Sequence, residues 1–324
     1  MMVSPFHIVP CFRTFVFIAI AMAGAITSHS QSVQLLLVRA DSLMDVDKPQ
    51  RALEIFDQAV KKESSTATHL GRARAWYTLD RMDRFLQDVE KALKIDSTSA
   101  EAHYQRAMYA LRAEDSATAE YHASRAIAHA KENRMRARSC YLRGEALAGL
   151  KRNDTAILAF EQAVALGVED VQGMRLLARL YDNADRNADA LRILERLCEL
   201  DPSDIGHWTN RGYELIMLGR YDEALPMCER ALEYDPDEPV ALSNRAYLFL
   251  KTGKETEAWA DVERSLRNFP SNPYALRTRG MLRLRRGERE KACEDLSVAK
   301  ALGDVPELDQ LLKDNCSTSS PRRR

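Results

Sequence analysis

Small residues recur at a fixed spacing of 34 residues in the C-terminal half of the chain. One such set is Gly212, Ala246 and Gly280. Two further sets keep the same spacing: Gly219, Gly253 and Gly287, and Ala224, Ala258 and Ala292. A period fixed to the residue is typical of proteins built from stacked copies of one supersecondary unit. It constrains the fold more than any single motif in the sequence does.

Eight repeats fit this period when it is followed back towards the N-terminus. Small residues predominate at positions eight, twenty and twenty-seven, where two helices must approach closely, with bulkier apolar residues at helical spacing between them. Nothing in the sequence reads as a strand. We expect repeats near residues 33–65, 66–99, 100–136, 137–170, 171–204, 205–238, 239–272 and 273–306.

Prolines and glycines stand where such helix pairs should begin and end. Pro202 and Pro236 follow second helices, because proline cannot continue a helix. Gly219 falls at the turn inside its repeat, where a backbone with positive φ favours glycine. Pro49 is expected at the first residue of a helix, where its missing donor costs nothing. Pro226 lies about one turn inside its helix and should loosen that turn.

The chain from about residue 33 to 306 therefore resembles the tetratricopeptide repeat family, which stacks helix–turn–helix units of 34 residues. The resemblance implies an all-α fold, a right-handed α/α superhelix (solenoid) of eight such units whose first helices form a concave surface. Residues 305–315, VPELDQLLKDN, resemble the extra helix that covers the last unit. Two residues depart from the family pattern: Phe85 replaces an alanine, and Arg283 replaces an aromatic residue or leucine.

The first 30 residues are of a different kind. Arg13 precedes the apolar run Phe15–Ile26, which is too short to span a bilayer comfortably. Small residues follow, up to Ser30 before Gln31. This pattern predicts a secretory signal peptide over residues 1–30, and hence an exported protein, periplasmic or secreted, of a bacterium. An uncleaved membrane anchor is the alternative.

Five cysteines remain after such a cleavage, so at least one thiol should be free. None belongs to a C-x-x-C pair or to a metal-binding spacing. Four occupy helix positions usual for small apolar residues, which favours buried thiols. Cys198 and Cys228 are expected on adjacent second helices and are the pair to test for a disulfide. The five are Cys140, Cys198, Cys228, Cys293 and Cys316.

Charge and motifs argue against several classes of function. With 47 basic and 48 acidic residues, the chain lacks the basic excess of a nucleic-acid binder. There is no phosphate-binding loop, H-E-x-x-H or G-x-S-x-G motif, and no segment could hold a catalytic domain. His69 and His103 share position four of adjacent repeats and read as stacked core histidines. We expect no enzyme, no cofactor and no metal, and a disordered basic tail at 316–324.

Arginine occupies position seven in seven of the eight repeats. Position twenty-three, sixteen residues later, holds an acid in the repeats of Arg72, Arg245 and Arg279, and the repeat with Leu177 there holds Ile193. This matched exchange predicts ion pairs within each repeat rather than a ladder for anions. Arg106 would face His122 and Arg211 would face Met227, so these arginines lack that acid and are expected to be freer.

The family resemblance implies that positions two, five, nine, twelve and thirteen of the first helices line the concave groove. Tyrosine and methionine are enriched there, and both suit protein interfaces. An ordinary groove edge, with tyrosines that only cover helix backbones, is the alternative. The candidate binding residues are Tyr77, Tyr104, Met108, Tyr141, Arg175, Arg179, Tyr213, Met217, Tyr247, Tyr274 and Met281. Four of them, Tyr141, Arg175, Arg179 and Tyr213, are expected to be adjacent.

The function that these observations favour is a non-enzymatic exported scaffold that binds a protein or extended peptide in this groove. A structural subunit of an envelope complex, held by its edges or convex face, is the second hypothesis. An accessory chain of an enzyme is the third. The sequence does not identify the partner, because a fold shared by many functions does not specify one.

Overall fold

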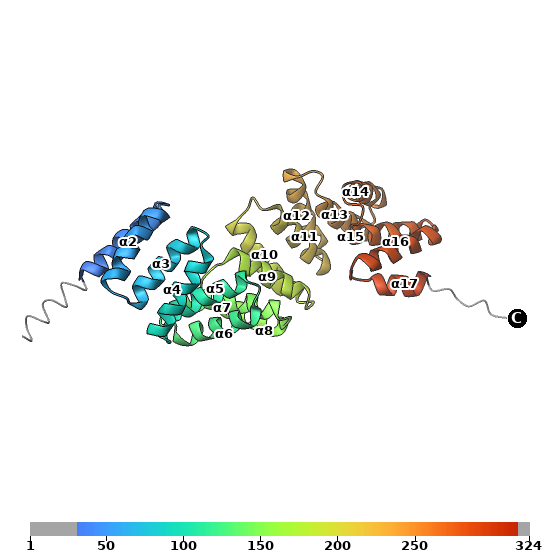
Figure 1. Cartoon of the computed structure of the whole chain (residues 1–324). Coiled ribbons are helices and arrows are strands. Elements are labelled where there is room, and N and C mark those ends of the chain that lie inside the picture. The colour runs from blue at the N-terminus through green and yellow to red at the C-terminus, as the bar shows by residue number, and fades with distance from the viewer. Residues whose placement is uncertain (1–30, 317–324) are drawn as a thin grey trace, which may run out of the picture. The chain divides into compact units, whose positions relative to one another are not determined.

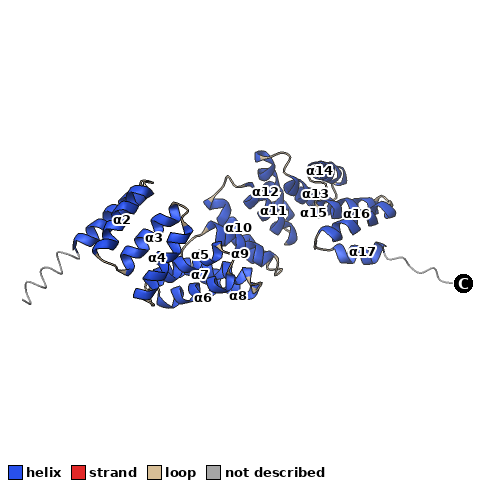
Figure 2. Cartoon of the chain, viewed as in Figure 1, coloured by secondary structure: helices blue, strands red, loops and turns tan. Residues whose placement is uncertain are grey.

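The computed structural model describes residues 31–316, and every regular element in that range is an α-helix (Figure 2). The expected all-α fold is therefore confirmed. The predicted signal peptide at 1–30 and the tail residues 317–324 lie outside the described residues. The chain divides into two compact parts, one ending at Val168 and the other starting at Glu169. Each part is described by itself (Figure 1).

The N-terminal part begins with a helix over residues 31–45. The helices that follow it are α2 (Pro49–Lys62), α3 (Thr66–Thr78), α4 (Met82–Ile95), α5 (Ala100–Arg112), α6 (Ser116–His129), α7 (Asn133–Gly149) and α8 (Asn153–Ala165).

The C-terminal part has the same alternation of helices. It contains α9 (Val171–Asp182), α10 (Asn187–Leu200), α11 (Ile205–Met217), α12 (Tyr221–Tyr234), α13 (Pro239–Lys251), α14 (Glu255–Asn268), α15 (Pro273–Arg285), α16 (Arg289–Leu302) and α17 (Leu308–Cys316). In both parts consecutive helices pack as pairs. The first helices of neighbouring pairs are also in contact: α11 contacts α13, and α13 contacts α15.

Small residues allow the two helices of a pair to approach closely. A Cβ atom at Gly144 would lie 2.6 Å from the ring of Phe160, and one at Gly280 would lie 2.8 Å from the side chain of Leu296. Both large side chains are fully buried. The apolar side chain of one helix therefore fills the space that glycine leaves on the other, which explains the small residues at position eight.

Left-handed residues end the first helices of the pairs. Gly219, Gly253 and Gly287 have φ between 71° and 81°, as the sequence predicted. Other repeats use residues with a side chain at the same turn, such as Asp80 at 57° and Lys151 at 58°. Glycine there removes a steric cost but is not required for the turn.

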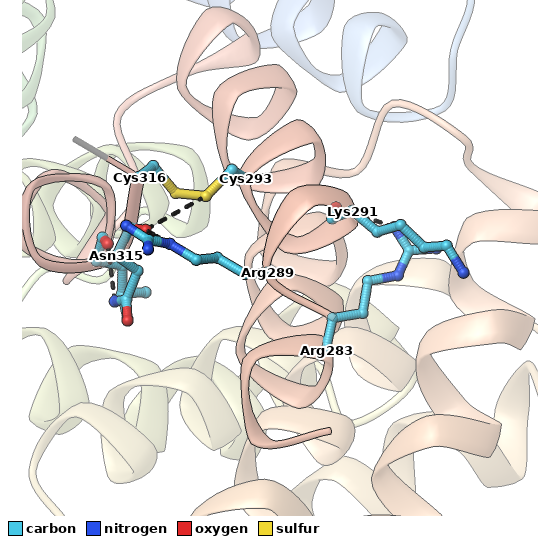
Figure 3. Close-up of a disulfide and its surroundings, with 7 residues drawn as sticks. Arg283, Arg289, Lys291, Cys293, Asn315 and Cys316 are labelled. Carbon is cyan, nitrogen blue, oxygen red and sulfur yellow. Dashed lines mark hydrogen bonds between the residues drawn. A yellow bond between two sulfur atoms is a disulfide. The ribbon is translucent and has the colours of Figure 1, made fainter. Parts of the chain in front are cut away.

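The two departures from the repeat pattern are accommodated by new contacts. Phe85 is 1% exposed, and its ring centroid lies 5.5 Å from that of Tyr77 and 6.2 Å from that of Tyr109. Arg283 donates from Nη1 to the backbone oxygen of Lys291 at 3.1 Å, as Figure 3 shows, and lies 2.8 Å from a carboxylate oxygen of Asp295. Both side chains thus make contacts within their helix pair or with the next one.

Helix α17 covers the end of the last helix pair. Val305 and Leu308 are buried in the same apolar cluster as residues of α15 and α16. A disulfide joins Cys293 of α16 to Cys316, the last residue of α17 (Figure 3). The covering helix is therefore held by a covalent bond as well as by apolar contacts.

Cys198 and Cys228, the pair singled out for a disulfide test, are not bonded to each other. Both thiols are free and buried, as is that of Cys140, which agrees with the buried thiols that their helix positions favoured. Cys228 points into its own helix pair, where its sulfur lies 3.1 Å from the position of a Cβ on Gly212. Its burial raises the pKa of this thiol to about 12. A side chain that packs inside its own pair does not face the neighbouring second helix.

The arginines at position seven form the ion pairs that the sequence predicted. Arg245 donates from Nε and Nη2 to the two carboxylate oxygens of Asp261, at 2.7 and 2.9 Å. Arg279 holds Asp295 in the same way, at 2.9 and 2.8 Å. Each pair joins the first helix to the second, in the two-pronged geometry that a planar guanidinium favours. Arg72 and Asp88 form a third such pair.

Two further arginines are not free, contrary to expectation. Arg106 donates from Nε to Glu90 at 3.0 Å, and Arg211 lies 3.5 Å from Glu195. Both acids precede their arginine by sixteen residues and belong to the second helix of the preceding pair. An arginine at position seven lies between the second helix of its own pair and the second helix of the preceding pair, so an acid on either helix can reach it. The arginines thus join neighbouring repeats as well as the helices of one repeat.

The Arg245–Asp261 pair gives a direct test of this structural role. Because Asp261 is 6% exposed, each single alanine variant should cost about 1 to 3 kcal/mol of unfolding free energy. The double variant should cost clearly less than the sum of the two, since the pair is lost only once. Urea denaturation of the four proteins, followed by circular dichroism, measures the cycle. Additive losses would contradict a structural pair.

Candidate functional site

The eleven candidate binding residues fall into both parts of the chain. Tyr77, Tyr104, Met108 and Tyr141 belong to the N-terminal part, and the other seven to the C-terminal part. Because the two parts are described separately, the expected adjacency of Tyr141 with the three residues on α9 and α11 stays a prediction. The contacts within each part show which candidates can meet a partner.

Two tyrosines of the N-terminal part are buried by structural contacts. Tyr104 is 8% exposed; it accepts a hydrogen bond of 2.9 Å from Nη2 of Arg138, whose guanidinium lies 4.4 Å from its ring. Tyr141 is 3% exposed and donates to the backbone oxygen of Val168 at 2.8 Å. These two residues hold helices together. Tyr77, at 36% exposure, is the candidate tyrosine here that presents its ring.

Most arginines on the first helices are also engaged. Arg74 pairs with Asp41 at 2.7 Å and Arg112 with Asp80 at 2.6 Å. Arg175 contacts Asp204 and donates to Nε2 of His207 at 2.9 Å. Arg179 is different, because it is exposed and forms no ion pair or hydrogen bond with any residue of the described range 31–316.

The helices α9, α11 and α15, each the first helix of its pair, carry a surface that we call the tyrosine–acid surface. We define it by Arg179, Asp182, Tyr213, Glu214 and Tyr274. The rings of Tyr213 and Tyr274 meet edge to face, with their centroids 5.8 Å apart. Both tyrosines are half-buried, and burial raises the pKa of each. Met217 and Met281 are partly buried on the same helices.

Both acids of this surface hold their protons more tightly than usual. Burial and the nearby Asp185 carboxylate raise the pKa of Asp182. Burial raises the pKa of Glu214 to about 7, against a hydrogen bond of 2.9 Å from the side-chain amide of Asn187. Neither carboxylate has an ion-pair partner among the residues that the structure describes. The surface therefore combines unpaired negative charge with aromatic edges.

A buried cation, Arg277, lies next to this surface, with its guanidinium 5.8 Å from the ring of Tyr274. Arg277 is 2% exposed, and its guanidinium lies 4.0 Å from the ring of Tyr247. Its Nη1 donates to the backbone oxygen of Pro306 at 3.1 Å, and burial lowers its pKa. Lys251 pairs with Glu307 at 2.9 Å beside it. Tyr247, at 4% exposure, is thereby unable to offer its ring to a partner.

Glu214 and Arg277 were not among the predicted site residues. Arg277 had a usable signal, because it shares position five with Arg175, which was predicted. Glu214 had one too, because Leu248 and Leu282, one and two repeats on, are apolar, so an acid at this position departs from the pattern. Only the structure shows that this carboxylate is buried and accepts a hydrogen bond from Asn187.

Models of the tetratricopeptide repeat match the sequence over residues 37–100, 141–205 and 207–238. The chain belongs to the tetratricopeptide repeat family. This agrees with the 34-residue period and with the helix pairs of both parts. No curated protein matches the sequence.

Solved structures of other tetratricopeptide repeat proteins share the fold. PilW, a type IV pilus biogenesis factor, is 16% identical with a TM-score of 0.55, over 65% of this chain and 97% of its own. PilF of Pseudomonas aeruginosa is 17% identical with a TM-score of 0.50, over 65% and 94%. YrrB, which has an unusual peptide-binding site, is 20% identical with a TM-score of 0.42, over 68% and 95%. At these identities the likeness concerns the fold alone.

Within residues 31–316, no helix is long and apolar enough to cross a membrane. No group of histidine, cysteine and acidic side chains in that range is arranged to hold a metal ion.

The Glu214 carboxyl should make stability depend on pH. Its pKa is raised from 4.5 to about 7, so the folded protein binds the proton more tightly than the unfolded chain. The stability that this proton supplies is complete below pH 4.5 and is lost as the pH rises to 7. Glu214→Gln keeps an oxygen for Asn187 and should stabilise the protein at pH 8 by about 1 to 3 kcal/mol, allowing for solvent screening.

Denaturation of wild type and Glu214→Gln at pH 5 and pH 8 measures this difference. Glu223→Gln is the matched control, because Glu223 lies on the exposed side of α12 and pairs with Arg220. Equal stability of wild type and Glu214→Gln at pH 8 would contradict a buried, uncompensated carboxylate.

Proposed function

We propose that this tetratricopeptide repeat protein is a non-enzymatic scaffold that binds a protein or extended peptide along its first helices. The fold is one suited to protein and peptide binding. The observation that carries the proposal is the tyrosine–acid surface, where Arg179 and Asp182 of α9 have no charged partner within residues 31–316 and the Asp182 carboxylate acts on the half-buried Tyr213 and Tyr274. Elsewhere on the first helices, arginines such as Arg74 and Arg112 are already paired.

Unpaired charges of both signs, one helical turn apart on α9, suit an extended chain with its alternating donors and acceptors. The edges of Tyr213 and Tyr274 add apolar area at low entropic cost, because tyrosine has few rotatable bonds. A few such anchors supply most of the binding energy of an interface. Tyr104, Tyr141, Arg175 and Tyr247 act in the scaffold itself, since their side chains are engaged within the chain.

Binding should therefore depend on the tyrosine–acid surface. We expect Arg179→Ala, Asp182→Ala and Tyr213→Ala each to weaken capture of selected peptides by tenfold or more, about 1.4 kcal/mol. The probe is a displayed library of random 12-residue peptides, selected on the chain from Gln31 and measured by isothermal titration. Helical circular dichroism should stay unchanged, because repeat stability depends on the packing positions.

Arg192→Ala and Glu229→Ala are matched controls on second helices, where both side chains are exposed. They should leave peptide capture unchanged. If they abolish it while the first-helix variants bind normally, the second hypothesis applies, in which the protein is a structural subunit held by its outer helices. Measurable catalytic turnover of a substrate by the purified chain would instead favour the third hypothesis, an enzyme-related role.

We further propose that the protein is exported and that its mature chain starts near Gln31. The Cys293–Cys316 disulfide supports this, since structural disulfides persist in oxidising compartments such as the bacterial periplasm. We expect N-terminal sequencing of native material to begin near Gln31 and thiol counting to find three free cysteines. A chain that keeps Met1 in the membrane fraction, with Cys293 and Cys316 reduced, would exclude export by a cleaved signal.

A further inference from the structure

Two neighbouring helix pairs of the N-terminal part carry the same contact with one substitution. His69, Arg72 and Asp88 of α3 and α4 are each followed 34 residues later by His103, Arg106 and His122 of α5 and α6. A histidine thus replaces the carboxylate that the first contact is built around. The two contacts form a natural comparison inside one molecule.

The first contact is an ion-pair network. Nδ1 of His69 lies 2.8 Å from a carboxylate oxygen of Asp88, and Arg72 donates to both oxygens of that carboxylate. Burial alone would raise the pKa of Asp88, but the hydrogen bonds from Arg72 and His69 lower it. The carboxylate therefore stays charged in mild acid and can accept a hydrogen bond from Nδ1–H of His69.

The second contact has no carboxylate. Nδ1 of His103 lies 2.9 Å from Nδ1 of His122, and Nε2 of His103 lies 3.1 Å from the backbone oxygen of Ser97. A carbonyl accepts hydrogen bonds only, so Nε2 of His103 carries a proton and its Nδ1 accepts from His122. A proton added to Nδ1 of His103 would set two N–H groups against each other.

The charges around this contact are mostly positive. The His129 ring stacks on His103 with centroids 6.2 Å apart, and Nε2 of His129 is buried without a hydrogen-bond partner in the structure. Arg125, on α6, acts on His103, and Arg106, on α5, acts on His122.

Acids reach the contact only from a distance. Glu90 of α4 is engaged with Arg106 at 3.0 Å, and Asp96 precedes α5 and acts weakly on His103. On the side of α7, Arg143 pairs with Glu120 of α6 at 3.2 Å. No carboxylate in residues 31–316 forms a hydrogen bond with His103 or His122. An added proton on the pair is therefore left uncompensated.

We propose that the seam between α5 and α6 is a pH-sensitive contact, whose transient opening becomes more frequent on acidification to about pH 5, while opening of the equivalent seam between α3 and α4 changes much less. Burial lowers the pKa of His103, and burial with the neighbouring His103 and Arg106 lowers the pKa of His122 to about 4. In the unfolded or opened chain a histidine has an ordinary pKa near 6.5. That chain therefore binds protons at pH values at which the histidines of the closed seam stay neutral. The stability of the closed seam is complete above pH 6.5 and is lost as the pH falls towards 4.

The opening would reach beyond the two histidines. Helix α6 packs against α7, and α5 carries Tyr104, which accepts the hydrogen bond from Arg138 of α7. Separation of α5 from α6 would therefore loosen the stacking of neighbouring repeats. A scaffold with such a seam would change its shape between a neutral and an acidic compartment.

Hydrogen exchange of the full chain, corrected for the intrinsic effect of pH, tests the proposal. Between pH 7.5 and pH 5 the protection of amides in α5 and α6 should fall about 30-fold, as a histidine pKa of about 4 against 6.5 requires. Protection in α3 and α4 should change much less. An equal fall in both pairs, or none in α5 and α6, would overturn the proposal.

His122→Asp is the matched variant, because it gives α5 and α6 the residues that α3 and α4 already have. It should remove the pH-dependent loss of protection in α5 and α6. A variant that folds and keeps the loss would also overturn the proposal. Proton NMR titration of the wild-type histidine rings provides a readout that needs no variant: His122 should titrate near pH 4, and titration of both rings at an ordinary pH of 6.5 would contradict the mechanism.

Discussion

The close approach of two helices within each repeat is the constraint on which the rest of the structure depends. At Gly144 and Gly280 the facing side chains, Phe160 and Leu296, occupy the space that any Cβ would need. Because this crossing recurs once per repeat, it fixes the register of every other position. Arg245 and Arg279 meet their aspartates sixteen residues on only because the crossing holds the two helices of a pair in one relative position.

Periodicity predicted the parts of the fold that repeat. The helix pairs, the left-handed turns at Gly219 and its equivalents, and the Arg245–Asp261 pair all follow from comparing one repeat with the next. The disulfide could not be found in this way, since Cys316 lies in α17, beyond the last repeat, and has no equivalent. Periodicity also left the state of Cys198 and Cys228 open, since it places both on neighbouring second helices but does not give the direction of the Cys228 side chain.

The candidate site was predicted less completely than the fold. Position along the repeat identified the face of the first helices, and it placed Arg179, Tyr213 and Tyr274 on it. It could not separate side chains that are available from those consumed by neighbours, because that depends on the residue 30 or so positions away. Tyr247 is covered because Arg277 happens to stack on it, and Arg175 is engaged because Asp204 and His207 follow. Whether a side chain is free to bind a partner depends on two repeats together, whereas the sequence pattern describes one repeat at a time.

Position twenty-three shows how a repeat array can vary chemistry without varying shape. Asp261 and Asp295 at this position each bind an arginine of the same repeat. Met227 cannot do so, and Arg211 pairs instead with Glu195 of the preceding pair. His122 places a second histidine next to His103. The backbone is the same in each case, because the small residues at the crossing maintain it. Electrostatic differences between repeats therefore arise from single substitutions at helix seams, where burial magnifies the effect of each charge. The same reasoning explains Glu214: an acid at an apolar position costs stability, and the cost is tolerated because the neighbouring crossings hold the helices in place.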